Sequence, residues 1–571
     1  MGTTDLVVRF AGEGGQGIVT AGESLAATAA QAGYHVQTYA TFPSQILGGP
    51  VFTQAHISTA PTLSDGDEID VLVAFNEEAF RLHRDQLRSG GVVIYNSEAF
   101  DPPAEIRSFG LPFDEIARQV GNARAANMVV LGAIAPLVNF PLAALKDYAT
   151  RRFTRGRSGD RAIIASNHDA LDAGAEAGRK SGFSLGELAP PRPPGYKQWM
   201  ITGNAAIALG AARAGLDFYA GYPISPATTI LVWMEQNLVG AGRFAYQVSS
   251  EIEAINALVG AGFAGKKAMT ATSGPGLSLM SEGLGLAWMA EIPLVVVDVQ
   301  RGGPATGLPT KTEQSDLFAC FHPAHGDVRL PLIAPGTVRE CFDAGVMSVN
   351  WAERYQGPVI LLTEMQQAER SQNIPAPDLH AVKTESRAVH ADGNDFRRYE
   401  SDSLGPMPLP GGPAPYIANA SEHDGIGDTT HLPRHHVHGI ERRFAKLELL
   451  RDGSYEAENA DAPIVVMPWG GSKGAAREAY LRLRDQGLDI GWVYTMYLHP
   501  LPSGLEDLLR QKELVIVPEL NYQGQWSSIL RSQGVKAASI TQYDGTPFKA
   551  GDLAERLQQT VARQRASQVP A

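Results

Sequence analysis

Two glutamates, Glu251 and Glu253, stand at the start of the otherwise apolar segment "SSEIEAINALVGAGFAG". Ser250 and Glu253 fit a capping box, in which the serine caps the first helical turn and the glutamate reaches back to a free backbone amide. Glu251 has no such duty, and at helical spacing it shares an apolar face with Ala254 and Ile255. It either favours the positive end of its helix or serves a ligand.

Three loops follow apolar segments that are typical of buried strands. In "AGYPISPAT" the hydroxyl of Ser225 stands between two prolines, which restrict the backbone around it. In "VDVQRGGPATGLPTKTEQSD" Arg301 comes directly after the strand, and its guanidinium suits a carboxylate. "ATSGPG" is a third such loop. The alternatives are a rigid turn for the first loop and a structural ion pair for Arg301. Loops at strand carboxyl ends are where open α/β sheets bind ligands.

The turn "GEGGQG" follows a strand and precedes a helix, so its backbone amides could hold a phosphate. A dinucleotide site is disfavoured, because the third glycine is displaced from G-x-G-x-x-G spacing and the next strand, "HVQTYATF", lacks an acid for a ribose. Another phosphate-bearing ligand and a purely structural turn both stay open.

Five histidines between His423 and His438 could suggest a metal, but their spacing matches no zinc signature. We interpret this segment as a solvated connection and assign no metal site to the chain.

Strand-like and helix-like segments alternate along most of the sequence, which predicts an α/β fold of several open, mostly parallel sheet domains. "IPLVVVDVQ" is almost wholly apolar, as expected of a parallel strand buried on both faces. "LGELAPPRPPGYKQW" is a proline-rich linker. The expected divisions are residues 1–185, the linker 186–198, residues 199–385, an extended connection 386–460, and a last domain 461–560.

The bulk composition is that of a soluble globular protein, with 571 residues, 44% of them hydrophobic, and a net charge of −13. This acidic balance argues against a nucleic-acid or anionic-membrane partner. No apolar run approaches the length that crosses a bilayer, and because the first residues lack the basic and apolar pattern of a signal peptide, we expect no cleaved leader. The two cysteines, Cys320 and Cys341, are too few for a disulfide framework or an iron–sulfur cluster. We expect a reducing, cytoplasmic location.

Taken together, the motifs resemble the 2-oxoacid:acceptor (ferredoxin) oxidoreductases over nearly the whole chain. "FAGEGGQGIVTAGESLA" is similar to the start of the γ domain, which is Rossmann-like in this family. "GYPISP", "SSEIEA", "TATSGPGLSLMSEGLG" and "QRGGPATGLPTKTEQSDL" resemble the thiamine-pyrimidine-binding domain of the α subunit, in the family's order. "PELNYQGQ" resembles the signature of its transketolase C-terminal-like domain. The resemblance is to an α subunit fused behind a γ domain, most like the 2-oxoglutarate:ferredoxin type.

The resemblance implies a role for each candidate residue. In thiamine diphosphate enzymes a glutamate contacts the aminopyrimidine ring and promotes the tautomer that deprotonates the thiazolium carbon, and Glu251 occupies the matching position. Ser225 and Arg301 would bind the carboxylate of the substrate. Further substrate contacts are expected from Tyr222, Thr228 and Lys311. Further cofactor contacts are expected from Thr272, Ser273 and Gly274, and, in the γ domain, from Gly14, Gly15, Gln16 and Gly17.

What the chain lacks implies a partner. Thiamine enzymes hold the diphosphate and Mg²⁺ through a Gly-Asp-Gly motif, which this sequence does not contain. That site and a [4Fe-4S] cluster are therefore expected on a β subunit, which would pass electrons to ferredoxin within an (αβ)2 heterotetramer. One departure concerns "VFTQAHIS", where many members carry an arginine and this chain has only His56. We therefore assign no anion contact to this strand. Coenzyme A is nevertheless expected to bind the γ domain.

The implied reaction is coenzyme A-dependent oxidative decarboxylation of 2-oxoglutarate to succinyl-CoA and CO2, or the reverse carboxylation. The same chemistry on pyruvate or on branched-chain or aryl 2-oxoacids is the first alternative. A free-standing transferase of transketolase type is disfavoured by the missing diphosphate motif. A non-catalytic nucleotide-binding scaffold is the alternative that "GEGGQG" permits.

Overall fold

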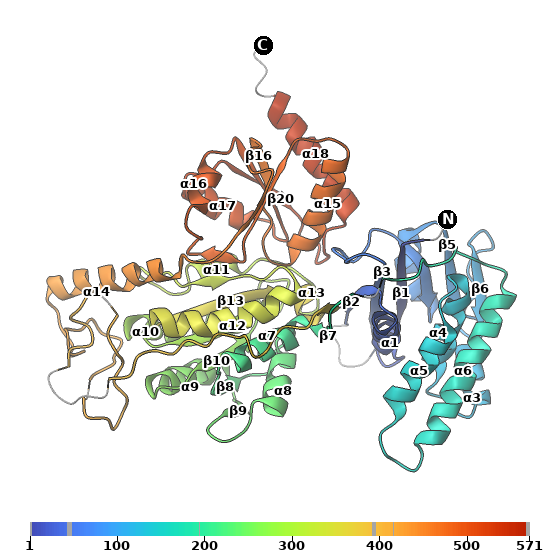
Figure 1. The fold of residues 1–571 in the computed structure, drawn as a ribbon, viewed down its shortest axis with the longest axis horizontal. Helices are drawn as coiled ribbons and strands as arrows, with labels where there is room; N and C mark the ends of the chain where they lie inside the picture. The colour runs from blue at the N-terminus through green and yellow to red at the C-terminus, as the bar shows by residue number, and fades with distance from the viewer. Residues whose placement is uncertain are drawn as a thin grey trace. The chain divides into compact units, whose positions relative to one another are not determined.

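The computed structural model describes residues 3–42, 48–192, 194–390, 396–402, 404–414 and 416–566. The chain splits into two compact units, unit 1 with Met1–Ile201 and Arg370–Ala376, and unit 2 with Thr202–Glu369 and Pro377–Ala571. Each unit combines helices with sheets, which are mostly parallel in unit 2 and mixed in unit 1, so the predicted α/β class is confirmed (Figure 1).

Unit 1 is built on one sheet, whose described strands run in the order β6-β5-β4-β1-β3-β2-β14-β7. The strands are β1 (Asp5–Glu13), β2 (His35–Thr41), β3 (Pro50–Ser58), β4 (Ile69–Ala74), β5 (Leu87–Asn96), β6 (Ser108–Leu111), β7 (Gln198–Thr202) and β14 (Ser371–Pro375). β1, β4, β5 and β6 are parallel neighbours, whereas β3 runs antiparallel to both β1 and β2. The first strand, helix and second strand therefore form the predicted βαβ unit, with "VFTQAHIS" inserted between its strands.

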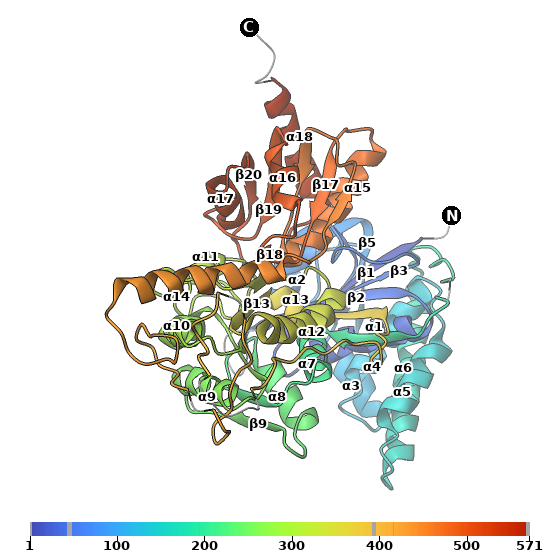
Figure 2. The ribbon, with the colours of Figure 1, turned by 60° about the vertical axis from the view of Figure 1, so that its left-hand side comes forward.

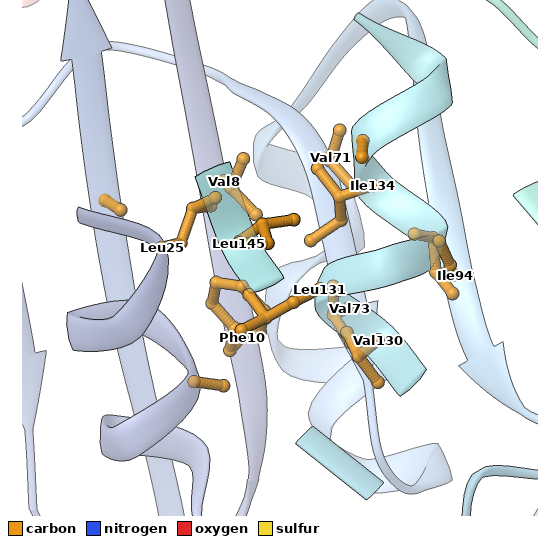
Figure 3. Packing of buried hydrophobic residues seen from close by; sticks show 14 of the residues in the cluster. Val8, Phe10, Leu25, Val71, Val73, Ile94, Val130, Leu131, Ile134 and Leu145 are labelled. Atoms are coloured by element: carbon orange, nitrogen blue, oxygen red, sulfur yellow. The ribbon is translucent and has the colours of Figure 1, made fainter. Parts of the chain in front are cut away.

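The core of unit 1 lies between this sheet and the helices on one of its faces. The helices of the unit are α1 (Ile18–Gln31), α2 (Glu77–His83), α3 (Phe113–Gln119), α4 (Ala126–Ile134), α5 (Leu142–Phe153) and α6 (Asp160–Lys180). Alternate strand residues such as Val8, Phe10 and Val73 point toward Leu25 of α1 and Leu131 of α4 (Figure 3). The intervening residues pack on the opposite face, where α2 contributes to a second apolar cluster. The sheet is thus covered on both faces, as parallel strands require.

The segment Arg370–Ala376 returns to unit 1, although the sequence placed it inside the domain 199–385. β14 pairs antiparallel with β2. Asn373 donates to the carbonyl of Tyr34 at 2.8 Å and accepts the amide of Val36 at 2.7 Å. Buried Arg370 forms an ion pair with Asp65 at 3.2 Å. These polar contacts depend on residues some 300 positions away, which a local pattern does not record.

Unit 2 contains a sheet in the order β18-β12-β13-β11-β10-β8-β9. Its strands are β8 (Phe218–Gly221), β9 (Phe244–Gln247), β10 (Ala268–Thr272), β11 (Leu294–Gln300), β12 (Leu332–Ile333), β13 (Pro358–Glu364) and β18 (Tyr497–His499). Its helices are α7 (Gly203–Arg213), α8 (Thr228–Asn237), α9 (Glu251–Phe263), α10 (Gly274–Met289), α11 (Leu317–Phe321), α12 (Val338–Tyr355) and α13 (Met365–Glu369). β11 is buried at every position between its parallel neighbours β10 and β13, as predicted.

The strand order of this sheet reverses beside β8. From β8 the chain moves outward to β9, and it then crosses back to β10 on the other side of β8. β8, β9, β10 and β11 are mutually parallel, so their carboxyl ends share one edge. A reversal of this kind opens a crevice at that edge, which is where ligands bind in open α/β sheets.

A second sheet of unit 2 has the order β15-β17-β16-β19-β20. Its elements are β15 (Glu456–Glu458), β16 (Ile464–Val466), α15 (Lys473–Asp485), β17 (Gly491–Tyr494), α16 (Leu505–Arg510), β19 (Leu514–Glu519), α17 (Gln525–Ser532), β20 (Ala537–Thr541) and α18 (Ala550–Ala566). The chain leaves this sheet at β18, which follows β17 (Figure 2) and pairs antiparallel with β12 of the other sheet. Within the described part of the chain no helix is long and apolar enough to cross a membrane.

The expected connection 386–460 contains α14 (Pro433–Ala445), and its residues 391–395, 403 and 415 lie outside the described ranges. α14 is fixed by a buried ionic cluster in which Arg442 and Lys446 contact Glu291 at 2.9 and 3.0 Å. This segment is therefore tied to the end of α10, which precedes Glu291.

Candidate functional site

Glu251 begins α9 at the carboxyl edge of the parallel strands and is only 6% exposed. Ser250 caps the helix by accepting the amide of Glu253 at 3.2 Å. The Glu253 carboxylate accepts the amide of Ser249 at 2.8 Å, one residue before the amide predicted for a capping box. Among the described residues the Glu251 carboxylate has no hydrogen bond or ion pair. Capping is thus the task of Glu253, and Glu251 stays available to a ligand.

The turn from β10 into α10 lies directly against Glu251. A methyl group on Gly276 would lie 2.6 Å from Glu251 Oε1 and 2.0 Å from Thr272 Oγ1, so only glycine lets these two side chains pack against the turn. The Ser273 hydroxyl is buried and has no hydrogen-bond partner in the described chain. Gly274 follows at the first position of α10. Thr272 therefore lies beside Glu251, and Ser273 and Gly274 follow it at the start of α10.

Arg301 follows β11, the strand next to β10, and is 7% exposed. Its Nη1 donates to the main-chain carbonyl of Ser225 at 2.7 Å, while its Nε has no partner among the described residues. No carboxylate of the described chain lies within 4.0 Å of the guanidinium, so the alternative of a structural ion pair is not realised there. Burial lowers the pKa of Arg301, and the charge of Asp316 opposes that shift. A buried cation without a bonded anion is suited to the carboxylate of a ligand.

Hydrogen bonds from Asn204 of α7 fix the loop that contains Ser225. The Asn204 amide donates to the carbonyl of Pro226 at 3.0 Å and to Thr229 at 2.8 Å. Ser225 itself is exposed. The structure brings Ser225 and Arg301 together through the serine carbonyl, whereas the prediction relied on its hydroxyl.

The remaining predicted substrate residues lie around these two. Tyr222 is 38% exposed at the end of β8, and Thr228 begins α8. The Lys311 carbonyl accepts the amide of Gly302 at 3.1 Å, which brings the lysine backbone next to Arg301. Burial lowers the pKa of the Lys311 ammonium, against the attraction of Asp544.

Two acids near Arg301, buried Asp298 and half-buried Asp316, were not predicted. A methyl group on Gly274 would lie 2.7 Å from Asp316 Oδ2, which has no hydrogen-bond partner in the described chain. Burial and the charge of Glu313 raise the pKa of Asp316 to about 6, although Arg301 opposes the shift. Burial and the charge of Asp316 also raise the pKa of Asp298 on β11. An acid near the end of an otherwise apolar strand, "VVVDVQ", is the sequence signal that could have indicated them.

The glycine turn of unit 1 presents backbone groups only. The Gly15 and Gly17 backbones adopt positive φ angles of 97° and 76°, and Gly17 caps α1 without a side-chain hydrogen bond. Gln16 folds back to accept the amide of Glu13 at 2.8 Å, and Gly14 donates to the carbonyl of Gly49 at 3.3 Å. Gln16 therefore shapes the turn, and the free amides at the start of α1 remain for an anion.

The histidines of the connection form separate contacts. His436 contacts Glu422 at 2.6 Å, His438 contacts Asp402 at 3.3 Å, and His423 bonds the carbonyl of Ser421 at 3.0 Å. In the described ranges no three His, Cys, Asp or Glu side chains are grouped to hold a metal ion.

The fold and the convergent loops define an α/β protein with a candidate ligand site at a strand-order reversal. Comparison with known proteins gives that class a family. The family model described as "Pyruvate flavodoxin/ferredoxin oxidoreductase, thiamine diP-bdg" matches residues 209–440, and the model "Pyruvate ferredoxin/flavodoxin oxidoreductase" matches residues 7–177.

Relatives match over the full length of the chain. The 2-oxoglutarate oxidoreductase subunit KorA of Mycobacterium tuberculosis is 32% identical, over 98% of this chain and 92% of its own length. The 2-oxoacid:ferredoxin oxidoreductase 2 subunit alpha of Aeropyrum pernix is 27% identical, over 96% and 97%. A solved 2-oxoglutarate:ferredoxin oxidoreductase from Magnetococcus marinus, with 2-oxoglutarate, coenzyme A and succinyl-CoA bound, is 36% identical with a TM-score of 0.92, over 98% of this chain and 99% of that one.

The chain belongs to the 2-oxoacid:ferredoxin oxidoreductase family. Because its relatives are named as α or KorA subunits, it is one subunit of a multi-subunit oxidoreductase.

Proposed function

We propose that this chain is the α subunit, with a fused γ domain, of a coenzyme A-dependent 2-oxoglutarate:ferredoxin oxidoreductase. The reaction converts 2-oxoglutarate and coenzyme A into succinyl-CoA and CO2, and it passes two electrons to ferredoxin. The reverse carboxylation would use the same site. The observation that carries the proposal is the meeting, at one sheet edge, of buried Glu251 and buried Arg301, both without a bonded counter-ion in the described chain.

The site fits the pyrimidine half of thiamine diphosphate. Glu251 would contact the aminopyrimidine ring, with Thr272, Ser273 and Gly274 lining the same wall. When bound, this cofactor supplies the nucleophilic carbon that attacks the keto group of a 2-oxoacid. The part of Glu251 is to hold and return a proton at a ring nitrogen, which a carboxyl group shielded from water is placed to do.

Two cations suit a dicarboxylate. Arg301 would bind the carboxylate next to the keto group, with the Ser225 loop beside it. We assign the distal carboxylate of 2-oxoglutarate to Lys311, whose backbone is bonded next to Arg301. Tyr222 and Thr228 would line the same loop region. Pyruvate lacks the distal carboxylate, so loss of Lys311 should affect 2-oxoglutarate more than pyruvate.

Coenzyme A would use the glycine turn of unit 1. Its phosphates require donors, and Gly14, Gly15 and Gly17 precede the uncapped amides of α1. Gln16 would maintain the shape of the turn.

The missing functions are assigned to a β subunit. The sequence has no Gly-Asp-Gly motif, and its two cysteines, Cys320 and Cys341, are both buried and too few to hold an iron–sulfur cluster. Mg²⁺ with the diphosphate, and a [4Fe-4S] cluster that reduces ferredoxin, would therefore be held by that partner. We propose an (αβ)2 heterotetramer that acts in the cytoplasm.

The test is reconstitution with the product of the adjacent reading frame. The complex should reduce a viologen dye only when both coenzyme A and 2-oxoglutarate are present, and it should form succinyl-CoA. Preference for pyruvate or an aryl 2-oxoacid would replace the substrate assignment. Turnover by this chain alone would contradict the division of the site between two subunits.

A further inference from the structure

The segment Arg301–Asp316 leaves the candidate site and returns to it. At its start, Gly302 donates to the Lys311 carbonyl at 3.1 Å and accepts the amide of Leu308 at 2.7 Å. At its end, the amide of Asp316 donates to Gln300 Oε1 at 3.1 Å, directly before Arg301. The position of Arg301 thus depends on the segment on both sides of it.

This segment is fastened to the second sheet of unit 2 by Gln314. The main-chain amide of Gln314 donates to the carbonyl of Leu520 at 2.7 Å, and Gln314 Oε1 accepts the main-chain amide of Leu520 at 3.0 Å. Its Nε2 donates to the carbonyl of Trp469 at 2.8 Å, and its own carbonyl accepts Asn521 Nδ2 at 3.1 Å. Every polar group of this buried glutamine is therefore bonded to residues of the other sheet's domain.

Gln525 makes the second attachment, from the first residue of α17 (Figure 1). Its Nε2 donates to the carbonyl of Ser315 at 2.8 Å, and its Oε1 accepts the amide of Phe318 at 2.9 Å. These two bonds bracket Asp316 and the start of α11. Gln525 is itself buried, and its main-chain amide donates to Asn521 Oδ1 at 3.2 Å.

The signature "PELNYQGQ" is built for this attachment. Glu519 accepts Asn521 Nδ2 at 3.1 Å and the amide of Trp526 at 2.8 Å, and Asn521 Oδ1 accepts the amide of Gly524 at 2.8 Å. Hydrogen bonds thus join Glu519, Asn521 and the start of α17 into one rigid corner. The corner presents Gln525 to the segment of the other sheet.

We infer that Gln525, through Ser315 and Phe318, is a positioning residue that orients Arg301 for the carboxylate of the substrate. The inference rests on the proposed function of Arg301. It gives the C-terminal signature a part in substrate recognition without contact between the signature and the substrate. The Gln525 side chain can bind in only one orientation, because its NH2 group must face the Ser315 carbonyl and its oxygen must face the Phe318 amide.

The test compares Gln525→Met, which removes both bonds at similar volume, with the parent in the reconstituted complex. Two lost hydrogen bonds should raise KM for 2-oxoglutarate about tenfold, while kcat at saturation and thiamine diphosphate affinity stay near parental values. Gln525→Glu keeps an acceptor for Phe318 but cannot donate to Ser315, so its KM should rise less. The exposed Gln558→Met, in α18 of the same domain, is the matched control and should have no effect.

A double-mutant cycle with Arg301→Ala separates positioning from general support of the fold. If Gln525 acts through Arg301, Gln525→Met should change kcat/KM by less than about twofold in the Arg301→Ala background. An equal effect in both backgrounds, or an unchanged KM in Gln525→Met, would overturn the inference. A parent complex that turns over no 2-oxoacid would instead contradict the proposed function. If Gln525→Met fails to assemble, the same cycle with Gln525→Glu decides.

Discussion

Two glycine-rich turns connect a buried strand to a helix in this chain, and they differ in what surrounds them. The turn into α1 of unit 1 is closed by its own backbone and by Gln16, and it offers amides. The turn into α10 of unit 2 meets Glu251 from a neighbouring helix and lies one strand from Arg301. Similar sequences thus build different sites, because the chemistry of the second turn comes from other strands of its sheet.

The difference has a physical origin in topology. β10 stands beside the reversal of strand order, so loops from β8, β9 and β11 end near it. β1 has β3 and β4 as neighbours, and β3 runs in the opposite direction. An antiparallel neighbour ends its strand at the other edge, so fewer strand ends gather at the α1 turn. The turn into α1 therefore offers a ligand mainly backbone N–H donors.

Glu251→Gln should produce the largest loss, because it removes the acid that distinguishes the α10 turn. The complex should assemble and bind thiamine diphosphate, but turnover should fall by roughly two orders of magnitude or more, as for loss of a general acid–base group. Hydrogen–deuterium exchange at the thiazolium carbon of the bound cofactor measures the affected step.

Glu253→Gln is the matched control, since Glu253 lies two residues away and bonds Ser249 in the helix cap. It should cost at most about 1 kcal/mol of stability and leave the exchange rate near parental. Parental exchange in Glu251→Gln would assign Glu251 to the helix end alone.

Arg301→Ala should reduce kcat/KM for 2-oxoacids by about ten- to a hundredfold, because a charge-assisted pair with the substrate is lost. The exposed Arg243→Ala, in the same unit, should leave kcat/KM unchanged. Steady-state kinetics with 2-oxoglutarate and pyruvate would show a shared loss, as expected for a group that binds the carboxylate common to both. A value equal to the parent's would make Arg301 structural.

Gly17→Ala tests the other turn. Gly17 has a φ of 76°, and a methyl group there would lie 2.3 Å from the Asn127 amide nitrogen. The strain should cost about 1–2 kcal/mol of stability in unit 1 and raise KM for coenzyme A, with thiamine diphosphate affinity unchanged. Thermal unfolding and coenzyme A titration measure the two effects. A loss of thiamine diphosphate binding would show that the two turns are not independent sites.

The sequence predicted the local parts of this picture and not the long-range ones. The burial of Glu251 followed from its helical spacing, and β11 followed from an unbroken apolar run. The insertion of β3 and the return of Arg370–Ala376 to unit 1 could not follow, because strand pairing partners are not recorded in local periodicity. The hydrogen bond from Gln525 to Ser315 joins residues more than 200 positions apart. The sequence therefore revealed the motif that contains Gln525 but not the segment that Gln525 contacts.

The smallest expected effect concerns stability and pH at Asp316, beside the α10 turn. Burial and Glu313 raise its pKa from 3.8 to about 6, so the folded chain binds this proton more tightly than the unfolded chain does. Folding is therefore favoured below pH 3.8, and this contribution is lost as the pH rises toward and through about 6. Asp316→Asn cannot ionise, so it should be more stable than the parent at pH 7.5, by at most about 3 kcal/mol. The difference should shrink as the pH falls below 6 and disappear below pH 3.8. Unfolding midpoints of both proteins, measured across that range, give the comparison. A gain of the same size at every pH would show that the asparagine acts by packing, and the α10 turn would then carry no electrostatic cost from Asp316.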